Sequence, residues 1–189
     1  MRKIINSTYV TLDGVVENPH LWPKLPLGDA AEHEEVQFEL LEQCDILLLG
    51  RRTYDVFAPA WTSRSGDPFA DRINSMRKVV ASGTLTGADW ANTEVVARGL
   101  AGRVRDLKSE PGGDIIQYGV GPVTKLLLHE GLLDELRLWV YPQFVRGSTA
   151  DLLFDPDLEA TFELRASRAL SNGIIVLQYS VHAASVASG

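Results

Sequence analysis

Short apolar segments alternate with segments of helical periodicity through the first two thirds of the chain. The β-branched stretch from Lys3 to Val10 predicts a strand, and the apolar run from Asp45 to Leu49 predicts a strand that is buried on both faces. Between them, a helix is predicted from about Asp29 to Cys44, with Asp29 as its N-cap. Such alternation predicts an α/β fold with a parallel sheet at its centre.

The same pattern continues to about residue 131. Helices are predicted over 51–57, over a short segment that ends at Ser75, and over 100–108 and 121–129, and strands over 78–81, 93–97 and 114–118. A polar loop with Pro59, Gly66 and Pro68 is expected after the first of these helices. Gly131 is expected to follow the last helix as its C′ residue.

The last third of the chain changes to strands alone. Strands are predicted over 135–141, 162–170 and 174–181, and Ser171-Asn172-Gly173 is a hairpin signal between the last two. The sequence therefore predicts one domain over residues 1–182, with three layers and a mixed, mostly parallel sheet that ends in an antiparallel hairpin. A frayed tail is expected over 183–189.

Charge and cysteine content narrow the function. The chain has 189 residues and a net charge of -7, so it has no electrostatic basis for non-specific binding to nucleic acid or to a membrane surface. No apolar stretch approaches the length of a membrane span. Cys44 is the only cysteine, which excludes an intramolecular disulfide and agrees with a reducing, cytoplasmic location. We expect its thiol to be buried.

Two glycine-bearing turns join apolar strands to helices. In Gly50-Arg51-Arg52-Thr53, the free amides of a helix N-terminus and two guanidinium groups could hold a phosphate, or the segment could be a turn with solvated arginines. Gly119-Val120-Gly121 would allow close approach of a pyrophosphate, although tight turns of this kind often need glycine for other reasons. Both turns are expected at the carboxyl ends of the strands, where ligands bind in open α/β sheets. Ser82 is expected at the same end.

Several segments, in order along nearly the whole chain, resemble the dihydrofolate reductase-like superfamily, and in particular the reductase domain of the bifunctional riboflavin-biosynthesis deaminase–reductase. These segments are Thr11-Leu12-Asp13-Gly14, residues 45–54, Pro59-Ala60-Trp61 and residues 131–138. The zinc-binding deaminase half of the bifunctional enzyme has no counterpart, because the chain lacks a Pro-Cys-x-x-Cys motif. The chain thus resembles a stand-alone reductase domain.

The resemblance implies a cofactor and an activity. The cofactor would be NADPH, with Gly50, Arg51, Arg52 and Thr53 on its phosphates, Ser82 near the 2′-phosphate, and Gly119, Val120 and Gly121 around the pyrophosphate. The reaction would be hydride transfer to a small heterocyclic or carbonyl substrate, as in 5-amino-6-(5-phosphoribosylamino)uracil reductase. The resemblance also implies a homodimer. The apolar segment Leu138-Trp139-Val140-Tyr141 is expected near a sheet edge, where such a contact could form.

Asp13 and Glu34 are the candidate catalytic acids, and the resemblance suggests that they lie on the substrate side. Asp13 matches an aspartate close to the substrate, although an aspartate before glycine can equally be a turn residue. Glu34 corresponds to a helix carboxylate of folate reductases, or it belongs to a solvated acidic helix face, and it lies one turn before Phe38 and Leu41 on one stripe. Trp22 and Trp61, expected in loops, could stack on a planar substrate or cover a local core.

Two departures from the family pattern keep a second function open. Val120 stands where the family often has a second glycine or a serine, and Phe144 to Ser148 replaces a Leu-Gly-x-Gly turn. These changes motivate the alternative of a nucleotide- or ligand-binding module without turnover. No metal site is expected, because the four histidines do not have metal-ligand spacing.

Overall fold

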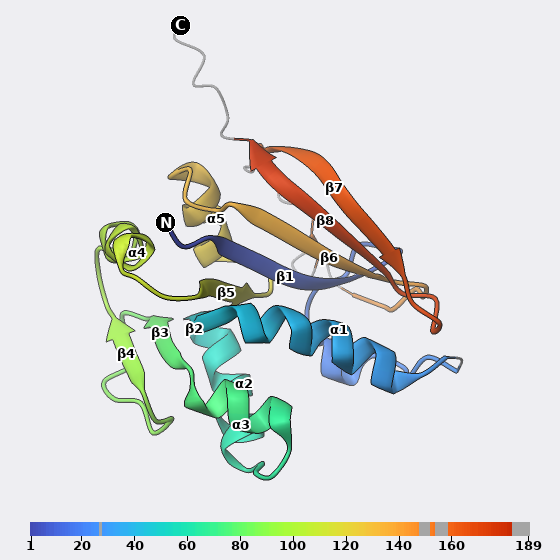
Figure 1. The fold of residues 1–189 in the computed structure, drawn as a ribbon, viewed down its shortest axis with the longest axis horizontal. Helices are drawn as coiled ribbons and strands as arrows, with labels where there is room; N and C mark the ends of the chain where they lie inside the picture. Colours follow the sequence, from blue (N-terminus) through green and yellow to red (C-terminus); the bar gives the residue numbers. More distant parts are fainter. Residues whose placement is uncertain (27, 148–151, 154–158, 183–189) are drawn as a thin grey trace, which may run out of the picture.

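Eight strands form one sheet within the described residues, which are 1–26, 28–147, 152–153 and 159–182 of the computed structural model. The strands are β1 (Ile4–Thr11), β2 (Cys44–Gly50), β3 (Arg77–Ala81), β4 (Thr93–Val96), β5 (Asp114–Tyr118), β6 (Glu135–Tyr141), β7 (Thr161–Ala169) and β8 (Ile175–His182). Their order is β4-β3-β2-β5-β1-β6-β8-β7 (Figure 1). The first six in this order are parallel, and β8 and β7 are antiparallel to their neighbours. The predicted mixed sheet is confirmed; Ser148 and the tail expected over 183–189 lie outside the described residues.

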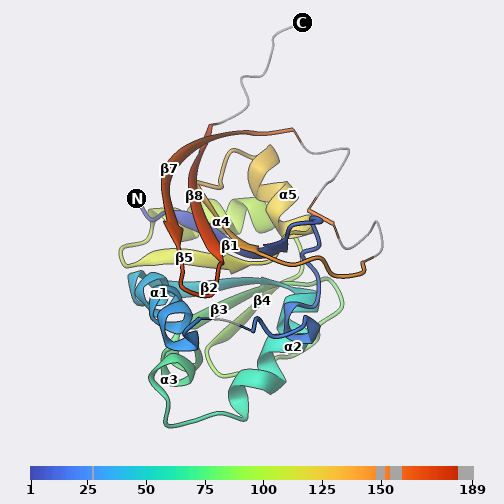
Figure 2. The same ribbon diagram turned by 90° about the vertical axis from the view of Figure 1, so that its right-hand side faces the viewer.

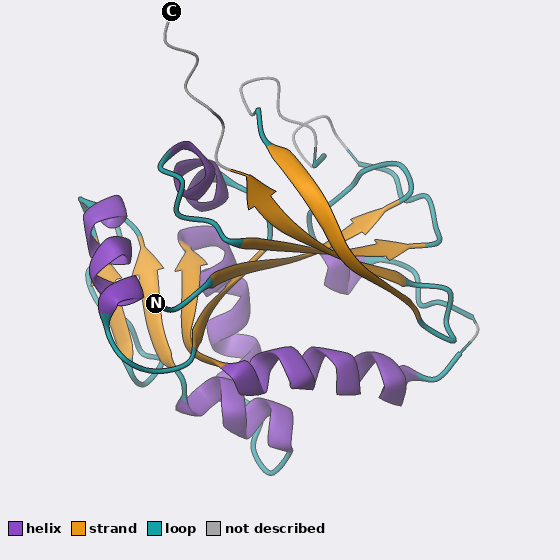
Figure 3. Ribbon diagram, turned by 45° about the horizontal axis from the view of Figure 1, so that its top comes forward, coloured by secondary structure: helices purple, strands orange, loops and turns teal. Residues whose placement is uncertain are grey.

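Helices cover both faces of the parallel part of the sheet. They are the 3-10 helix η1 (Pro19–Leu21), α1 (Ala30–Gln43), α2 (Arg51–Thr62), α3 (Pro68–Ser75), α4 (Leu100–Ser109) and α5 (Pro122–His129). Apolar side chains of α1, α2 and α3 pack on one face, and those of α4 and α5 pack on the other (Figures 1 and 2). The long helix α1 also reaches under the antiparallel strands (Figure 3). The predicted three layers are therefore confirmed.

The centre of the core is β2. Its residues Ile46 to Leu49 are at most 1% exposed and contribute to the hydrophobic clusters on both faces. Burial of each such side chain stabilises the fold by roughly 1.5–3 kcal/mol. This strand lies between β3 and β5, and helices cover both of its faces, so the continuous apolar run at residues 46–49 packs against both layers.

Helix α2 extends beyond its predicted end at Phe57. Pro59 lies inside the helix, where its ring removes one backbone hydrogen bond. The added turn places Trp61 against Phe69 of α3, with ring centroids 5.2 Å apart, and next to Phe57. Packing of these rings on the core outweighs the lost hydrogen bond. Trp61 is therefore a helix residue and not, as expected, a loop residue.

Strand β6 is not at an edge of the sheet. It pairs with β1 on one side and β8 on the other, and Trp139 is 1% exposed. The apolar character of Leu138 to Tyr141 thus reflects an interior strand, which corrects the expected position near an edge. The edge is formed by β7, which is mostly exposed.

Cys44 lies at the junction of α1 and β2 and is fully buried. Burial raises the pKa of its thiol to about 12, so the expected buried thiol is confirmed. Helix α1 ends at Gln43, one residue earlier than predicted, and Asp29 caps it as expected. Within the described chain, no helix is both long enough and apolar enough to cross a membrane.

Candidate active site

Neighbouring strands β2 and β5 lead into helices on opposite faces of the sheet. Tyr54 of α2 packs in the cluster on one face, whereas Val123 of α5 packs in the cluster on the other. The two turns adjoin, because a Cβ placed on Gly50 would lie 3.5 Å from Val123 Cγ2. A divergence of this kind creates a crevice at the carboxyl ends of the strands, where ligands bind. The two glycine turns therefore meet, as the sequence predicts.

The three helices that follow closely on parallel strands, α2, α4 and α5, differ from α1 and α3 at their first residue. The N-caps of α2, α4 and α5 are Gly50, Gly99 and Gly121, and within the described residues none has a side-chain hydrogen bond to its helix. In contrast, Asp29 and Asp67 cap α1 and α3 with hydrogen bonds of 2.8 Å. The uncapped N-termini can donate their amides to an anion.

Arginine side chains add positive charge to the same edge. Arg51 Nε donates to both carboxylate oxygens of Asp55, at 2.8 and 2.9 Å, and its Nη1 donates to Thr84 Oγ1 at 3.2 Å. This second contact connects the end of β2 to the turn after β3. Arg52 is largely exposed and lies 3.6 Å from Glu17. Thr53 follows in the first turn of α2.

Ser82 shapes the turn after β3. Its hydroxyl oxygen accepts hydrogen bonds from the amides of Thr84, at 3.3 Å, and Leu85, at 3.0 Å. The oxygen is thus engaged in the turn, and the hydroxyl proton is the part that could reach a ligand. The turn lies beside the end of β4, since the Ser82 amide donates to the Val96 carbonyl at 3.1 Å.

The segment Gly119-Val120-Gly121 borders open space. Gly119 has a φ of +76°, a conformation that favours glycine. A Cβ placed on Gly119 or Gly121 would meet no described protein atom within 4 Å. The surface of this turn is therefore accessible to a ligand. All eight residues that the sequence assigns to cofactor phosphates lie on the turns and helix starts that follow β2, β3 and β5.

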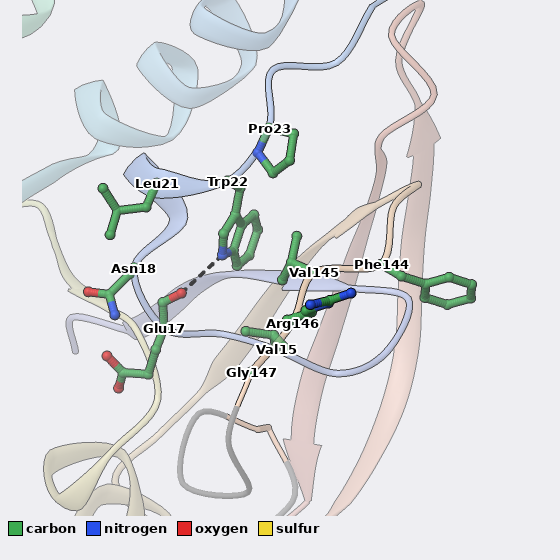
Figure 4. Close-up of a pocket in the computed structure, with 10 residues that line it drawn as sticks. All are labelled: Val15, Glu17, Asn18, Leu21, Trp22, Pro23, Phe144, Val145, Arg146 and Gly147. Atoms are coloured by element: carbon green, nitrogen blue, oxygen red, sulfur yellow. Dashed lines mark hydrogen bonds between the residues drawn. The ribbon is translucent and has the colours of Figure 1, made fainter.

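A cavity of about 390 Å³ lies at the same edge, beside β1 and β6. It is lined by residues that follow these strands: Val15, Glu17, Asn18, Leu21, Trp22, Pro23 and residues 144–147 (Figure 4). The two walls of the cavity are the segment 15–23 after β1 and the segment 144–147 after β6. The Trp22 indole N–H donates to the Glu17 carbonyl at 3.0 Å, and the ring lies between these walls (Figure 4). Arg146 contributes a cation to this lining and Glu17 a carboxylate, and most of the remaining lining residues are apolar.

Asp13 ties the two walls of this cavity together. Its carboxylate accepts hydrogen bonds from the Thr11 hydroxyl and from the Val145 amide, the latter at 3.3 Å. The Thr11 hydroxyl, followed by the Val145 amide, lowers the pKa of Asp13. At neutral pH Asp13 is thus a carboxylate, which can accept a hydrogen bond from a substrate but holds no proton to give.

A group of aromatic rings packs behind Trp22. Trp22 meets Tyr141 at a centroid distance of 5.3 Å, and the Tyr141 hydroxyl lies 3.4 Å from His33 Nε2. Tyr9 and Trp139 complete the group. Burial lowers the pKa of His33 and raises that of Tyr141 to about 12, so both side chains are neutral at pH 7.

Sequence reasoning missed this aromatic group. Two features of the sequence could have indicated it. Trp139 and Tyr141, two residues apart, lie on the same face of a strand, and His33 lies three residues before Val36. The buried stripe of α1 contains Val36, Leu40 and Leu41. Glu34 is exposed beside this stripe, and its negative charge partly offsets the lowering of the His33 pKa by burial.

None of Asp13, Glu34 and Trp61 is among the residues that line the cavity, although Asp13 contacts the lining through the Val145 amide. Glu34 is exposed on α1 and does not line the cavity. Trp61 is ten residues from Arg51 along α2, about 15 Å at 1.5 Å per residue. It stacks on Phe69 and lies under the Arg64 guanidinium, 4.8 Å from the ring centroid. Its contacts are those of a core residue.

Comparisons with known proteins identify relatives over nearly the whole chain. The family model of the RibD C-terminal domain matches residues 2–176. YyaP, an uncharacterized protein of Bacillus subtilis (strain 168), is 28% identical over 185 residues, which cover 94% of each chain.

Two solved structures share the fold. A candidate riboflavin biosynthesis protein from Shewanella sp. PV-4 superposes with a TM-score of 0.69 at 20% identity, over 95% of this chain and 99% of its own. A pyrimidine reductase-like protein from Corynebacterium diphtheriae superposes with a TM-score of 0.57 at 12% identity, over 96% and 92%. The likeness confirms the expected dihydrofolate reductase-like fold.

Proposed function

Because the chain belongs to the RibD C-terminal domain family, whose members are reductase-like, we propose that it is an NADPH-dependent reductase of a small heterocyclic or carbonyl substrate. The observation that carries this proposal is the meeting of two uncapped helix N-termini, those of α2 and α5, at the divergence of β2 and β5. Two adjacent donor sites of this kind suit a ligand with several phosphates.

The residues at this edge fit NADPH. Gly50 to Thr53 would hold phosphate at the start of α2, and Gly119 to Gly121 would hold the pyrophosphate at the start of α5. Arg51 and Ser82, at the ends of β2 and β3, would face the 2′-phosphate. When bound, NADPH supplies a hydride from its nicotinamide ring. The protein supplies phosphate grip, orientation and a partly apolar cavity.

The cavity beside β1 and β6 would take the substrate. The Trp22 ring offers a flat apolar surface for a heterocycle, and Arg146 offers a cation for an anionic group. These features suit 5-amino-6-(5-phosphoribosylamino)uracil, which has both a planar ring and a phosphate. Asp13 would orient the substrate as a hydrogen-bond acceptor. Because its pKa is lowered, the proton that follows hydride transfer would come from water.

Thermal unfolding with each nicotinamide cofactor tests the proposal. NADPH at a hundredfold over its Kd should stabilise the fold by about 2.7 kcal/mol, which raises the melting temperature by roughly 5–11 °C. We expect a smaller shift with NADH, which lacks the 2′-phosphate. No shift with either cofactor at millimolar concentration would contradict a dinucleotide site.

Turnover distinguishes the reductase from a binding module. Loss of nicotinamide absorbance with a heterocyclic phosphoribosyl substrate would support the reductase. A large NADPH shift with no oxidation of NADPH across a panel of heterocycles and carbonyl compounds would favour a ligand-binding module. That alternative is motivated by the two departures from the family pattern, Val120 in the glycine turn and the segment Phe144 to Ser148.

A further inference from the structure

Four buried polar side chains lie directly beneath the turn after β5. Asn6 and Thr8 belong to β1, Gln117 to β5 and Thr124 to α5, and each is at most 3% exposed. Thr8 Oγ1 donates to Asn6 Oδ1 at 2.8 Å, which turns the Asn6 amide nitrogen toward the turn. A buried polar cluster requires a reason, because each group must be satisfied to avoid a desolvation cost.

The donors of this cluster converge on one backbone carbonyl, that of Gly119. Asn6 Nδ2 lies 2.7 Å from the oxygen, Gln117 Nε2 lies 2.9 Å from it, and Thr124 Oγ1 lies 3.2 Å from it. Gln117 Oε1 accepts from the other N–H of Asn6, and the single proton of the Thr124 hydroxyl can go either to the Gly119 oxygen or to Gln117 Oε1, 3.1 Å away. One donor would satisfy a buried carbonyl. Two amide donors, with the Thr124 hydroxyl as a third group within reach, hold the direction of the carbonyl.

The direction of this carbonyl determines that of the next amide. Among the described residues there is no cis peptide bond, so the Gly119–Val120 peptide is trans. In a trans peptide the C=O and the N–H of the same unit point in opposite directions. Because the Gly119 carbonyl points into the core, the Val120 N–H points out of it, toward the open side of the turn.

We propose that Asn6, Gln117 and Thr124 are positioning residues that hold the Val120 N–H as a fixed donor to the pyrophosphate of the dinucleotide. The inference rests on the proposed function and assigns a task to residues outside the glycine turn. It also accounts for valine between the two glycines. Val120 is not among the residues with positive φ, so a side chain is compatible with donation by its backbone.

The variant Thr124→Val removes one donor and keeps the side-chain shape. We expect its Kd for NADPH to rise about threefold to tenfold, the effect of one hydrogen bond. Its Kd for adenosine 2′,5′-bisphosphate, which carries the 2′-phosphate without the full pyrophosphate, should be unchanged. Thr124→Ser retains the hydroxyl and should restore NADPH binding.

Thr93→Val is the matched control, because it removes a hydroxyl bond to the Trp90 carbonyl at the opposite edge of the sheet. It should leave both dissociation constants unchanged. Equal weakening of the two ligands by Thr124→Val would indicate a merely structural role and would overturn the inference. Unchanged NADPH binding in Thr124→Val would overturn it as well.

The wild-type chain offers a measurement that needs no variant. Inorganic pyrophosphate should shift the backbone amide resonance of Val120 in a ¹⁵N-labelled sample, and no shift at millimolar pyrophosphate would overturn the inference. If pyrophosphate shifts Val120 while neither NADPH nor NADH binds, the fixed donor stands and the proposed function fails. If NADPH binds without a shift of Val120, the function stands and the inference fails.

Discussion

The two edges of the parallel sheet differ in the backbone groups that they leave available, although arginine–carboxylate pairs occur at both. At the amino edge, arginines are paired with carboxylates: Arg2 with Asp45 at 2.6 Å, and Arg77 and Arg103 with Glu94, each at 2.7 Å. Both Arg77 and Arg103 also reach Glu110. At the carboxyl edge, three helices begin at glycine without a side-chain cap within the described residues.

This difference separates stability from binding. Ion pairs that share carboxylates close the amino edge and connect β3, β4 and α4. Glycines at the carboxyl edge leave amides accessible, although at Gly50, where φ is -78°, an Asp or Ser cap would stabilise α2. Changes at the carboxyl edge should therefore alter ligand binding more than folding, and changes at the amino edge should do the reverse.

The largest effect is expected when the carboxyl edge receives a negative charge. Gly50→Asp would cap α2, and a φ of -78° at this position suits an L residue. Its carboxylate would repel a phosphate by about 4 kcal/mol at 4 Å with an effective dielectric constant of 20. We expect NADPH affinity to fall at least about a hundredfold in a fluorescence titration.

Gly50→Asn separates charge from shape. It provides a similar cap without the charge, so its loss of NADPH affinity should be much smaller. Both variants should keep or raise the melting temperature of the free protein. Equal losses of NADPH affinity in the two variants would show that the size of the side chain at position 50, and not its charge, determines binding at this turn.

A smaller effect is expected when a positive charge is removed from the same edge. Arg51→Ala should weaken NADPH binding about tenfold, the value of a hydrogen bond to a charged group, and should change NADH binding little. Arg105→Ala is the control, because Arg105 is also half-exposed and paired with one carboxylate, Glu130, away from this edge. A parallel loss for NADPH and NADH in Arg51→Ala would place the 2′-phosphate elsewhere.

The smallest effect is expected at the amino edge and concerns stability alone. The Arg103 guanidinium, followed by that of Arg77, lowers the pKa of Glu94 from 4.5 to about 2. A carboxyl with a lowered pKa in the folded state stabilises the fold above pH 4.5, and this contribution is lost as the pH falls toward 2. Glu94→Gln should therefore cost about 1 kcal/mol at pH 7 in urea unfolding.

The pH dependence provides the check on this variant. The difference in unfolding free energy between wild type and Glu94→Gln should shrink between pH 4.5 and pH 2, because wild-type Glu94 becomes protonated there. NADPH affinity should be unchanged at pH 7. A constant difference over this pH range would assign the loss to packing.

Local patterns were sufficient to predict the sheet and the position, at its carboxyl edge, of the residues proposed to bind the cofactor. The run from Ile46 to Leu49 can only be satisfied between two strands, and Gly50 marks its end. Gly131, with a φ of +62°, and Gly173, with a φ of +83°, occupy the turn positions that their sequence context predicts. The residues proposed to bind the cofactor follow the strand ends directly, so topology alone brings them together.

Tertiary packing explains what was missed. Pro59 indicates a helix end, but ring packing by Trp61 and Phe69 continues the helix past it. The position of His33 against Tyr141 depends on how α1 lies across β1 and β6, which no local pattern contains. The same is true of the donors around the Gly119 carbonyl, which come from three elements.

Because Cys44 is buried, the reactivity of its thiol can report local unfolding of the sheet. The thiol is sealed where α1 enters β2, and its raised pKa keeps the thiolate scarce at neutral pH. A thiol reagent can reach it only after the centre of the sheet has separated. The rate of modification of this thiol therefore measures how often the core around it unfolds locally, with and without a ligand at the carboxyl edge of the sheet.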